Sequence, residues 1–180
     1  MVEVRLKNTK IELLQGDITA LDVEVILSPV DKNLSMDRGL ASVIKKIGGA
    51  EIEKEAVLKA PAEMGGVLVT SAGSLLAKYV FHLVIIEKKY IEREVLRKAL
   101  QGAFQLADAY QLKLMAVPFL GSPVAKSPAD AFARLMLEET VLFIQQHETG
   151  LEKIIFCLYN KEFYKYFEDQ LNFLRQTYFF

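Results

Sequence analysis

The chain has 180 residues, of which 52% are hydrophobic and 25% charged, and its formal net charge is −1. This length and composition are ordinary for a globular protein, so we expect residues 1–180 to form one domain with a sizeable core. The near-zero charge excludes a global field that would attract nucleic acid or an anionic membrane.

The cysteine content and the length of the apolar stretches indicate the cellular compartment in which the protein is expected. The chain has one cysteine, Cys157, so an internal disulfide is excluded and a reducing compartment is the simplest inference. The N-terminus carries charge every few residues, and the longest apolar stretch, residues 79–86, is far shorter than the ~20 residues of a membrane span. We therefore predict a soluble, cytoplasmic protein.

In the first third of the chain, three strands precede a helix. Apolar residues alternate with charged ones at 2–6, a second strand is predicted at 10–15, and residues 23–27 are nearly all apolar, which suits a strand covered on both faces. Helical spacing of apolar residues predicts a helix over residues 39–60, interrupted at Gly48-Gly49 and stopped by Pro61.

The remaining two thirds continue to alternate strands with helices. The predicted elements are strands at 67–70 and 80–86, a helix at 92–110, a strand at 114–119, a helix from the N-cap Ser127 to about 147, a strand at 154–159 and a helix at 161–178. This order predicts a three-layer α/β/α domain whose mixed, largely parallel central sheet has helices on both faces.

A first candidate site is the turn Gly16-Asp17-Ile18, which follows a predicted strand. Glycine lets the backbone turn sharply or approach a ligand, and an aspartate can accept hydrogen bonds from an amine such as that of adenine. The alternative is that Asp17 only caps the short turn that follows, because aspartate favours such turns.

Four motifs in order resemble those of the macro domain family, which binds ADP-ribose. They are LLQGDIT with the later strand and loop VEVILSPVDKNL, then GLASVIKKIGG, then GGVLVTSAGSLLAKYVFHLV, and then LMAVPFLGSPVAKSP. The resemblance covers nearly the whole chain and implies a mixed sheet between helices, in agreement with the predicted elements.

By this resemblance, Asp17 hydrogen-bonds the adenine and the backbone of Ile18 helps to hold it. Ser28 and Asp31 stand where the family has two asparagines beside the distal ribose. An ionised Asp31 could accept hydrogen bonds from ribose hydroxyls, and it is the one candidate catalytic residue, as a general base or by orienting a water. The alternative is an Asx turn in which Asp31 bonds the backbone near Asn33.

The family's first phosphate-binding turn corresponds here to Asp37, Arg38 and Gly39. The helix that begins near Leu40 offers free N–H groups to a diphosphate, and Arg38 could add a forked donor. Asp37 opposes an anion, and the alternative is that Asp37 and Arg38 pair with each other or with solvent.

The second phosphate-binding loop departs further from the family, because Pro123 and Lys126 replace glycines. The resemblance nevertheless implies ligand contacts from this loop, at Ser122, Val124, Ala125 and Lys126. The proline removes a backbone donor, the lysine could compensate electrostatically, and Ala125 lacks the aromatic surface that the family often has beside the ribose.

The remaining reactive side chains favour structural roles. His82 lies in an apolar strand and is expected to be a satisfied structural residue, Cys157 a buried apolar one, and His147 a side chain that complements a helix dipole. These three residues are far apart in sequence, so no metal site is predicted, and no cofactor is expected.

Three functions remain open. The first is binding of ADP-ribose or a related adenine nucleotide, the second a degenerate scaffold or oligomerisation module, and the third a hydrolase of ADP-ribosyl esters or O-acetyl-ADP-ribose, in which Asp31 and Lys32 supply charge. The predicted partner is an ADP-ribose-like small molecule, with no nucleic acid and no membrane. The apolar C-terminus TYFF could fold back or support a homo-oligomer.

Overall fold

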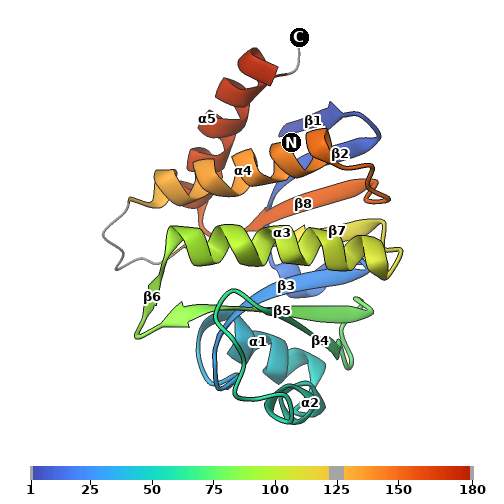
Figure 1. Ribbon diagram of the computed structural model, residues 1–180, viewed down its shortest axis with the longest axis vertical. Coiled ribbons are helices and arrows are strands. Elements are labelled where there is room, and N and C mark those ends of the chain that lie inside the picture. The colour runs from blue at the N-terminus through green and yellow to red at the C-terminus, as the bar shows by residue number, and fades with distance from the viewer. Residues whose placement is uncertain (1, 122–127, 179–180) are drawn as a thin grey trace.

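The computed structural model describes residues 2–121 and 128–178 (Figure 1). Its strands are β1 (Val2–Leu6), β2 (Thr9–Gln15), β3 (Val25–Asp31), β4 (Val67–Ser71), β5 (Tyr79–Glu87), β6 (Tyr90–Ile91), β7 (Leu114–Val117) and β8 (Lys153–Leu158). The helices are the 3-10 turn η1 (Ile18–Ala20), α1 (Gly39–Gly48), α2 (Glu51–Val57), α3 (Arg93–Ala109), α4 (Ala129–Gln146) and α5 (Lys161–Tyr178).

These strands form one mixed sheet in the order β1-β2-β8-β7-β3-β5-β4, with β6 paired to β5. The central pairs β2–β8, β8–β7, β7–β3 and β3–β5 are parallel, whereas β1, β4 and β6 pair antiparallel with their neighbours. The predicted mixed, largely parallel sheet is confirmed.

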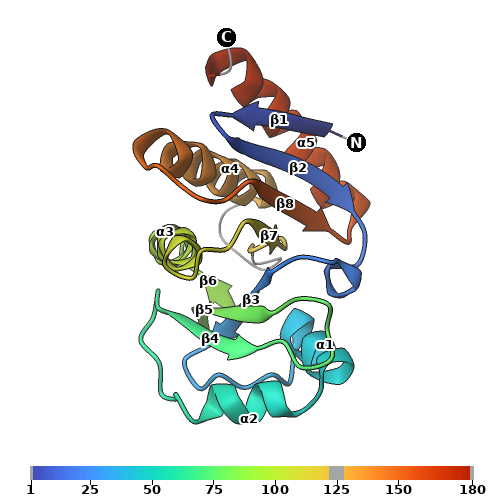
Figure 2. The ribbon, with the colours of Figure 1, turned by 90° about the vertical axis from the view of Figure 1, so that its right-hand side faces the viewer.

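Helices cover both faces of the sheet, as Figure 2 shows. Apolar side chains of α3, α4 and α5 form one core with one face, around Phe104, Phe132 and Phe156. Side chains of α1 and α2 form a second core with the opposite face, around Ile44 and Ile52. The predicted three-layer α/β/α arrangement follows from these two cores, since each sheet face is apolar and must be buried.

The predicted helix over residues 39–60 is two helices. α1 ends at Gly48, and Gly49 has φ of +111°, a conformation that glycine adopts without the steric cost of a side chain. α2 then begins at Glu51. The interruption expected at Gly48-Gly49 is confirmed. It separates two helices and is not a kink within one helix.

The third strand lies later in the chain than predicted. Its bounds are Val25–Asp31 rather than 23–27, so Ser28 belongs to the strand and not to the loop after it. Helix α4 begins at Ala129 with Pro128 in the cap position, while the predicted cap Ser127 lies outside the described residues. The short strand β6 is a further element that the apolar pattern did not indicate.

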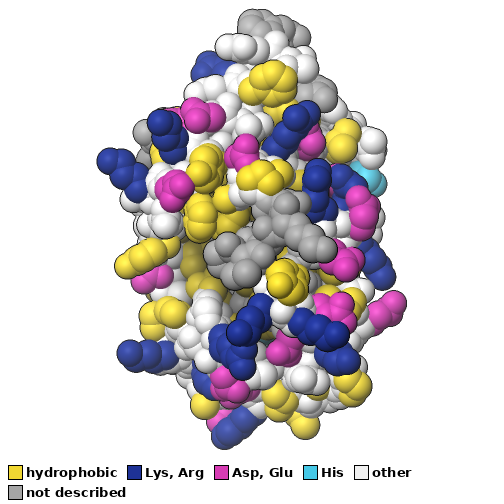
Figure 3. Space-filling model, turned by 90° about the vertical axis from the view of Figure 1, so that its left-hand side faces the viewer, with side chains coloured by type: hydrophobic (Ala, Val, Ile, Leu, Met, Phe, Trp, Pro, Cys, Tyr) yellow, Lys and Arg dark blue, Asp and Glu magenta, His cyan; other side chains and the backbone are white. Residues whose placement is uncertain are grey.

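The carboxyl ends of the parallel strands meet at one edge of the sheet, where ligands usually bind in α/β domains. The segments that leave these ends begin at residues 16, 32, 88, 118 and 159. Figure 3 faces this edge and shows a hollow with apolar side chains left of its centre and a group of Lys and Arg side chains below it. None of the helices in residues 2–121 and 128–178 is long and apolar enough to cross a membrane.

Candidate functional site

Two pockets lie at this edge of the sheet. The first, which we call the apolar pocket, has a volume of about 640 Å³ and is lined by Gly16, Asp17, Ile18, Leu40, Val43, Pro118, Phe119, Cys157, Tyr159, Asn160 and Phe163. The second, the charged pocket, has a volume of about 600 Å³ and is lined by Pro29, Val30, Asp31, Ser35, Asp37, Arg38, Ala41, Ile86, Lys88, Lys89, Ile91 and Gly121.

Two chain segments contribute to both pockets. The start of α1 places Leu40 in the apolar pocket and Arg38 in the charged one. The segment after β7 places Phe119 in the apolar pocket and Gly121 in the charged one. The two pockets are therefore neighbours, both lined by the first turn of α1, and together we call them the cleft.

Asp17 lies in the apolar pocket at the end of β2. It is the N-cap of η1, and its Oδ1 accepts hydrogen bonds from the Thr19 N–H at 2.9 Å and the Thr19 hydroxyl at 2.6 Å. The capping role expected as an alternative is thus present. The second oxygen, Oδ2, accepts no hydrogen bond from any residue that the structure describes, so it remains available to a ligand.

Aromatic side chains form the wall of the apolar pocket. The rings of Phe119 and Phe163 lie 4.1 Å apart between centroids with their planes inclined by 31°, and Tyr159 is 86% exposed at the mouth. Such surfaces suit a flat heterocycle. The sequence reasoning missed all three residues. Tyr159 and Phe163 belong to the aromatic pattern YNKEFYKYF, which also fits a helix packed on a core, and Phe119 ends an apolar run that predicts a buried strand.

Cys157 contributes a thiol to the same pocket but is not a nucleophile. The side chain is buried, and its Sγ lies 3.5 Å from the Gly16 carbonyl oxygen. Burial, with a smaller effect from the negative charge of Asp17, raises the pKa of the thiol to about 11. The prediction of a buried apolar residue is confirmed.

Asp31 stands in the charged pocket at the end of β3. Its Oδ1 accepts a hydrogen bond from the Asn33 N–H at 2.9 Å, so the predicted Asx turn is present. The carboxylate is only half-buried, and its Oδ2 accepts no hydrogen bond from the described part of the chain. The turn therefore fixes the carboxylate without using all of its acceptor capacity.

Ser28 is not brought to the cleft. It lies in the middle of β3, its side chain has no solvent exposure, and it lines neither pocket. Its position follows from the strand period, because Ser28 points to the face that carries Ile26 and Val30 and is covered by α1 and α2.

Asp37 and Arg38 were expected, as an alternative, to pair with each other or with solvent; Arg38 is exposed, and the described partners of Asp37 are other residues. The Asp37 carboxylate accepts hydrogen bonds from the Ser35 hydroxyl at 2.6 Å and from Lys45 Nζ at 2.9 Å, and Lys45 also bonds Glu53 at 2.9 Å. The hydrogen bond from Ser35, followed by that from Lys45, lowers the pKa of Asp37. Its negative charge is thus partly offset by Lys45, which reduces its repulsion of an anion in the cleft.

Arg38 is exposed at the N-cap position of α1 and makes no hydrogen bond or ion pair with the described residues. Gly39 follows with φ of +55°, and the first bond of the helix runs from the Ser42 N–H to the Arg38 carbonyl. The N–H groups of Gly39, Leu40 and Ala41 precede that bond and have no helical acceptor.

Among the described residues, Met36 precedes α1 and could have filled the cleft, but it does not. Met36 has no solvent exposure and packs in the core beneath α1, and its N–H donates to Glu53 Oε1 at 2.8 Å. Arg38 is exposed and lines the charged pocket. The predicted ligand contacts Ser122, Val124, Ala125 and Lys126 lie outside the described residues, as do Phe179 and Phe180 at the C-terminus.

The lysines of the β5–β6 turn are a second feature that the sequence reasoning missed. Lys88 and Lys89 line the charged pocket, and both have positive φ, 47° and 73°. Two lysines are common in a turn between two strands. The sequence alone therefore did not indicate that these cations would lie beside Asp31.

The two histidines lie outside both pockets. His82 is fully buried in β5, with Nε2 2.8 Å from the Thr70 hydroxyl, while its Nδ1 has no hydrogen-bond partner among the described residues. It is structural, as predicted, but only half satisfied. His147 caps α4, with its ring stacked on Phe143 at 4.6 Å, which agrees with its expected role.

The protein is thus an α/β/α domain that has two neighbouring pockets at the carboxyl edge of a mixed sheet, where ligands usually bind in such domains. The family model of the macro domain matches residues 27–136, and the chain belongs to the macro domain family.

The chain is also similar to other proteins and to solved structures. The chain is 37% identical over 163 residues to an uncharacterized protein of Aquifex aeolicus, covering 89% of this chain and 97% of that protein. It is 31% identical over 178 residues to an uncharacterized protein of Thermotoga maritima, covering 94% of this chain but 30% of that protein.

Two solved macrodomains share the fold. The Oceanobacillus iheyensis macrodomain with ADP has a TM-score of 0.88 at 20% identity, over 98% of this chain and 97% of that one. The Trypanosoma brucei macrodomain in complex with ADP-ribose has a TM-score of 0.82 at 23% identity, over 89% of this chain and 68% of that one.

Proposed function

We propose that this protein binds ADP-ribose or a closely related adenine nucleotide in the cleft at the carboxyl edge of its sheet. The observation that carries the proposal is that the first turn of α1 lines both the apolar pocket and the charged pocket. A ligand with a flat base at one end, a diphosphate in the middle and a sugar at the other end matches the sequence of apolar pocket, helix N-terminus and charged pocket.

At the apolar end, the base lies against the Phe119–Phe163 pair, and the free Oδ2 of Asp17 accepts a hydrogen bond from the adenine amine. This geometry favours adenine over a base that presents a carbonyl oxygen at the same position, since two acceptors face each other there without a proton.

In the middle of the cleft, the diphosphate lies at the N-terminus of α1. The N–H groups of Gly39, Leu40 and Ala41 and the positive end of the helix dipole favour an anion there. The guanidinium of Arg38 adds a charged donor that is not committed to any described carboxylate. At the far end, Asp31 accepts from the ribose hydroxyls.

The test is calorimetry of the purified protein with ADP-ribose and with its hypoxanthine counterpart, which lacks the amine. We expect saturable binding of ADP-ribose and weaker binding of the hypoxanthine analogue. Asp17→Asn retains an oxygen that caps η1 but replaces the acceptor facing the amine with a donor, so this variant should weaken ADP-ribose binding about tenfold and reduce the preference.

Asp22→Asn is the matched control, because Asp22 is an exposed aspartate that lines neither pocket. It should leave both affinities unchanged. Absence of any heat at millimolar ADP-ribose would rule out the proposal and favour the scaffold alternative.

The hydrolase alternative is favoured by one observation, the uncommitted Oδ2 of Asp31 in the charged pocket. Incubation with a protein carrying mono-ADP-ribose tests it. Release of ADP-ribose that Asp31→Ala abolishes would make the protein an enzyme, whereas release that this variant leaves unchanged would remove Asp31 from the mechanism.

A further inference from the structure

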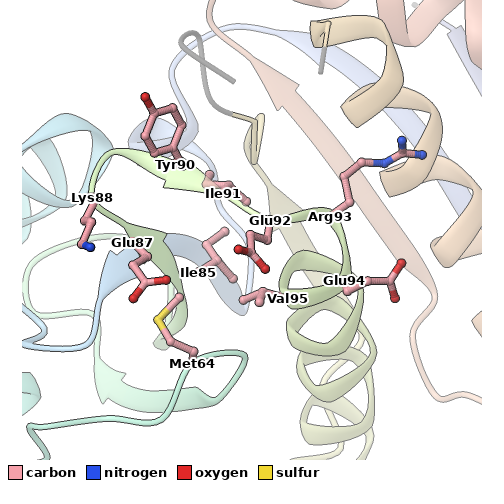
Figure 4. Close-up of a pocket in the computed structure, with 10 residues that line it drawn as sticks. All are labelled: Met64, Ile85, Glu87, Lys88, Tyr90, Ile91, Glu92, Arg93, Glu94 and Val95. Carbon is pink, nitrogen blue, oxygen red and sulfur yellow. The ribbon is translucent and has the colours of Figure 1, made fainter. Parts of the chain in front are cut away.

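A third hollow, which we call the hairpin pocket, lies between the β5–β6 hairpin and the start of α3. Its volume is about 710 Å³ (Figure 4). Its floor is apolar: Ile85 and Ile91 are buried, and Met64 and Val95 are half-buried. A surface of this kind accommodates a hydrocarbon chain.

Two carboxylates face this floor. Figure 4 shows the side chains of Glu87 and Glu92 extending into the space around Ile85, from the hairpin and from the helix start respectively. Neither makes a hydrogen bond or ion pair with the described residues, so their charges are uncompensated within the part of the chain that the structure describes.

Lys88 and Arg93 also line this hollow, but no ion pair joins either of them to Glu87 or Glu92 among the described residues. Arg93 and Glu94 point away from it along the outer side of α3, and Lys88 lies at its outer margin (Figure 4). The structural explanation, that the two glutamates are solvated surface residues, accounts for their exposure. It does not account for their placement on two elements around one apolar floor.

The occupant that fits is a cation at the end of an apolar stem. A lysine or arginine side chain lays its methylene groups along apolar surface while its charged group meets carboxylates. A phosphate or carboxylate ligand is disfavoured, because both charged groups that enter the hollow are negative.

The hairpin pocket adjoins the sugar end of the cleft. Lys88 and Ile91 line both the hairpin pocket and the charged pocket, so the hairpin turn is a shared wall. Because the two pockets share this wall, a polypeptide attached to a ribose in the charged pocket would have the hollow on the other side of the hairpin turn.

We propose that the hairpin pocket receives a lysine or arginine side chain of the polypeptide to which the bound ADP-ribose is attached. This inference rests on the proposed function and adds a preference for modified proteins with a basic residue near the attachment point. The cleft then recognises the nucleotide, and the hairpin pocket recognises its protein carrier.

The experiment compares three ligands by calorimetry. They are free ADP-ribose, a peptide with one ADP-ribosylated serine flanked by lysines, and the same peptide with norleucine in place of each lysine. Norleucine has a comparable apolar stem but no charge. We expect the lysine peptide to bind about fivefold more tightly than the norleucine peptide, as one exposed ion pair contributes up to about 1 kcal/mol.

The double substitution Glu87→Gln with Glu92→Gln should abolish this difference while leaving the affinity for free ADP-ribose unchanged. Glu94→Gln is the control, since this carboxylate points away from the hollow, and the preference for lysine should persist in it. Equal affinity of the unaltered protein for both peptides, or a preference that survives the double substitution, would overturn the inference while leaving the proposed function intact. If free ADP-ribose itself does not bind, the proposed function fails and this inference fails with it.

Discussion

Ser28 and His82 are register partners on the adjacent parallel strands β3 and β5, and each has a fully buried polar atom without a hydrogen-bond partner among the described residues. The Thr70 hydroxyl donates to the Ser71 carbonyl, so it accepts from the Nε2–H of His82. His82 Nδ1 is therefore the deprotonated nitrogen, an acceptor inside an apolar core.

The first prediction concerns the pH dependence of stability. Burial, with a smaller effect from the charge of Lys59, lowers the pKa of His82 from 6.5 to about 4. A histidine whose pKa is lower in the folded state stabilises the fold above pH 6.5, and this contribution is lost as the pH falls towards 4. We expect the free energy of unfolding to fall by about 2 kcal/mol from this group between pH 7.5 and 5.

Urea denaturation at the two pH values measures this loss, with His82→Leu as the comparison. Leucine has a similar size and does not titrate, and both proteins share all other ionisable groups. The variant should lose about 2 kcal/mol less than the unaltered protein over this range. An equal loss in both would contradict the assignment.

The second prediction concerns the Ser28 hydroxyl. A buried hydroxyl without a partner costs free energy, so Ser28→Ala should leave the free energy of unfolding unchanged or raise it by up to about 1 kcal/mol. Thermal and urea denaturation measure the change. A loss greater than about 1 kcal/mol would mean that the hydroxyl is hydrogen-bonded, by an internal water or by His82 Nδ1.

The third prediction concerns the contact between α3 and α4. The Glu139 carboxylate is almost fully buried and accepts from Arg97 Nε at 2.6 Å and from Gln101 Nε2 at 2.8 Å. Glu139→Ala removes these two hydrogen bonds and creates a cavity, while Arg97 keeps its ion pair with Glu94 and Gln101 keeps a hydrogen bond to the Glu139 carbonyl, so it should lower the free energy of unfolding by about 1–3 kcal/mol.

Its neighbour Glu138 provides the control, because its ion pair with Arg134 lies on the helix surface. Glu138→Ala should change the free energy of unfolding by less than about 0.5 kcal/mol, since exposed pairs of this spacing contribute little. Equal costs for the two substitutions would show that burial of the Glu139 network is unimportant.

The fourth prediction concerns the charge at the sugar end of the cleft. Asp31→Asn keeps the oxygen that accepts from the Asn33 N–H, so the free energy of unfolding should not change. It replaces the second oxygen, which is proposed to accept from the ribose hydroxyls, with an amide donor, so ADP-ribose should bind about two- to fivefold more weakly. Unchanged or tighter binding would mean that the carboxylate does not hold the ribose hydroxyls.

Much of the fold was predictable because strand and helix periods are local properties. The alternation of VEVRL and the apolar run IIFCLY marked strands within one or two residues of their observed bounds. The error at β3 has a physical cause: the small polar Ser28 followed by Pro29 reads as the start of a loop, while parallel pairing with β5 continues the strand to Asp31.

The sequence by itself determined the order of the elements, the α/β/α class, and the turn-capping roles of Asp17 and Asp31, because each depends on residues close together in the chain. Only the tertiary structure decided which side chains share the cleft. It buried Ser28, joined Phe119 to Phe163, placed Lys88 and Lys89 beside Asp31, and paired Asp37 with Lys45. Those contacts depend on how strands distant in sequence align at one edge of the sheet, and no local pattern encodes that alignment.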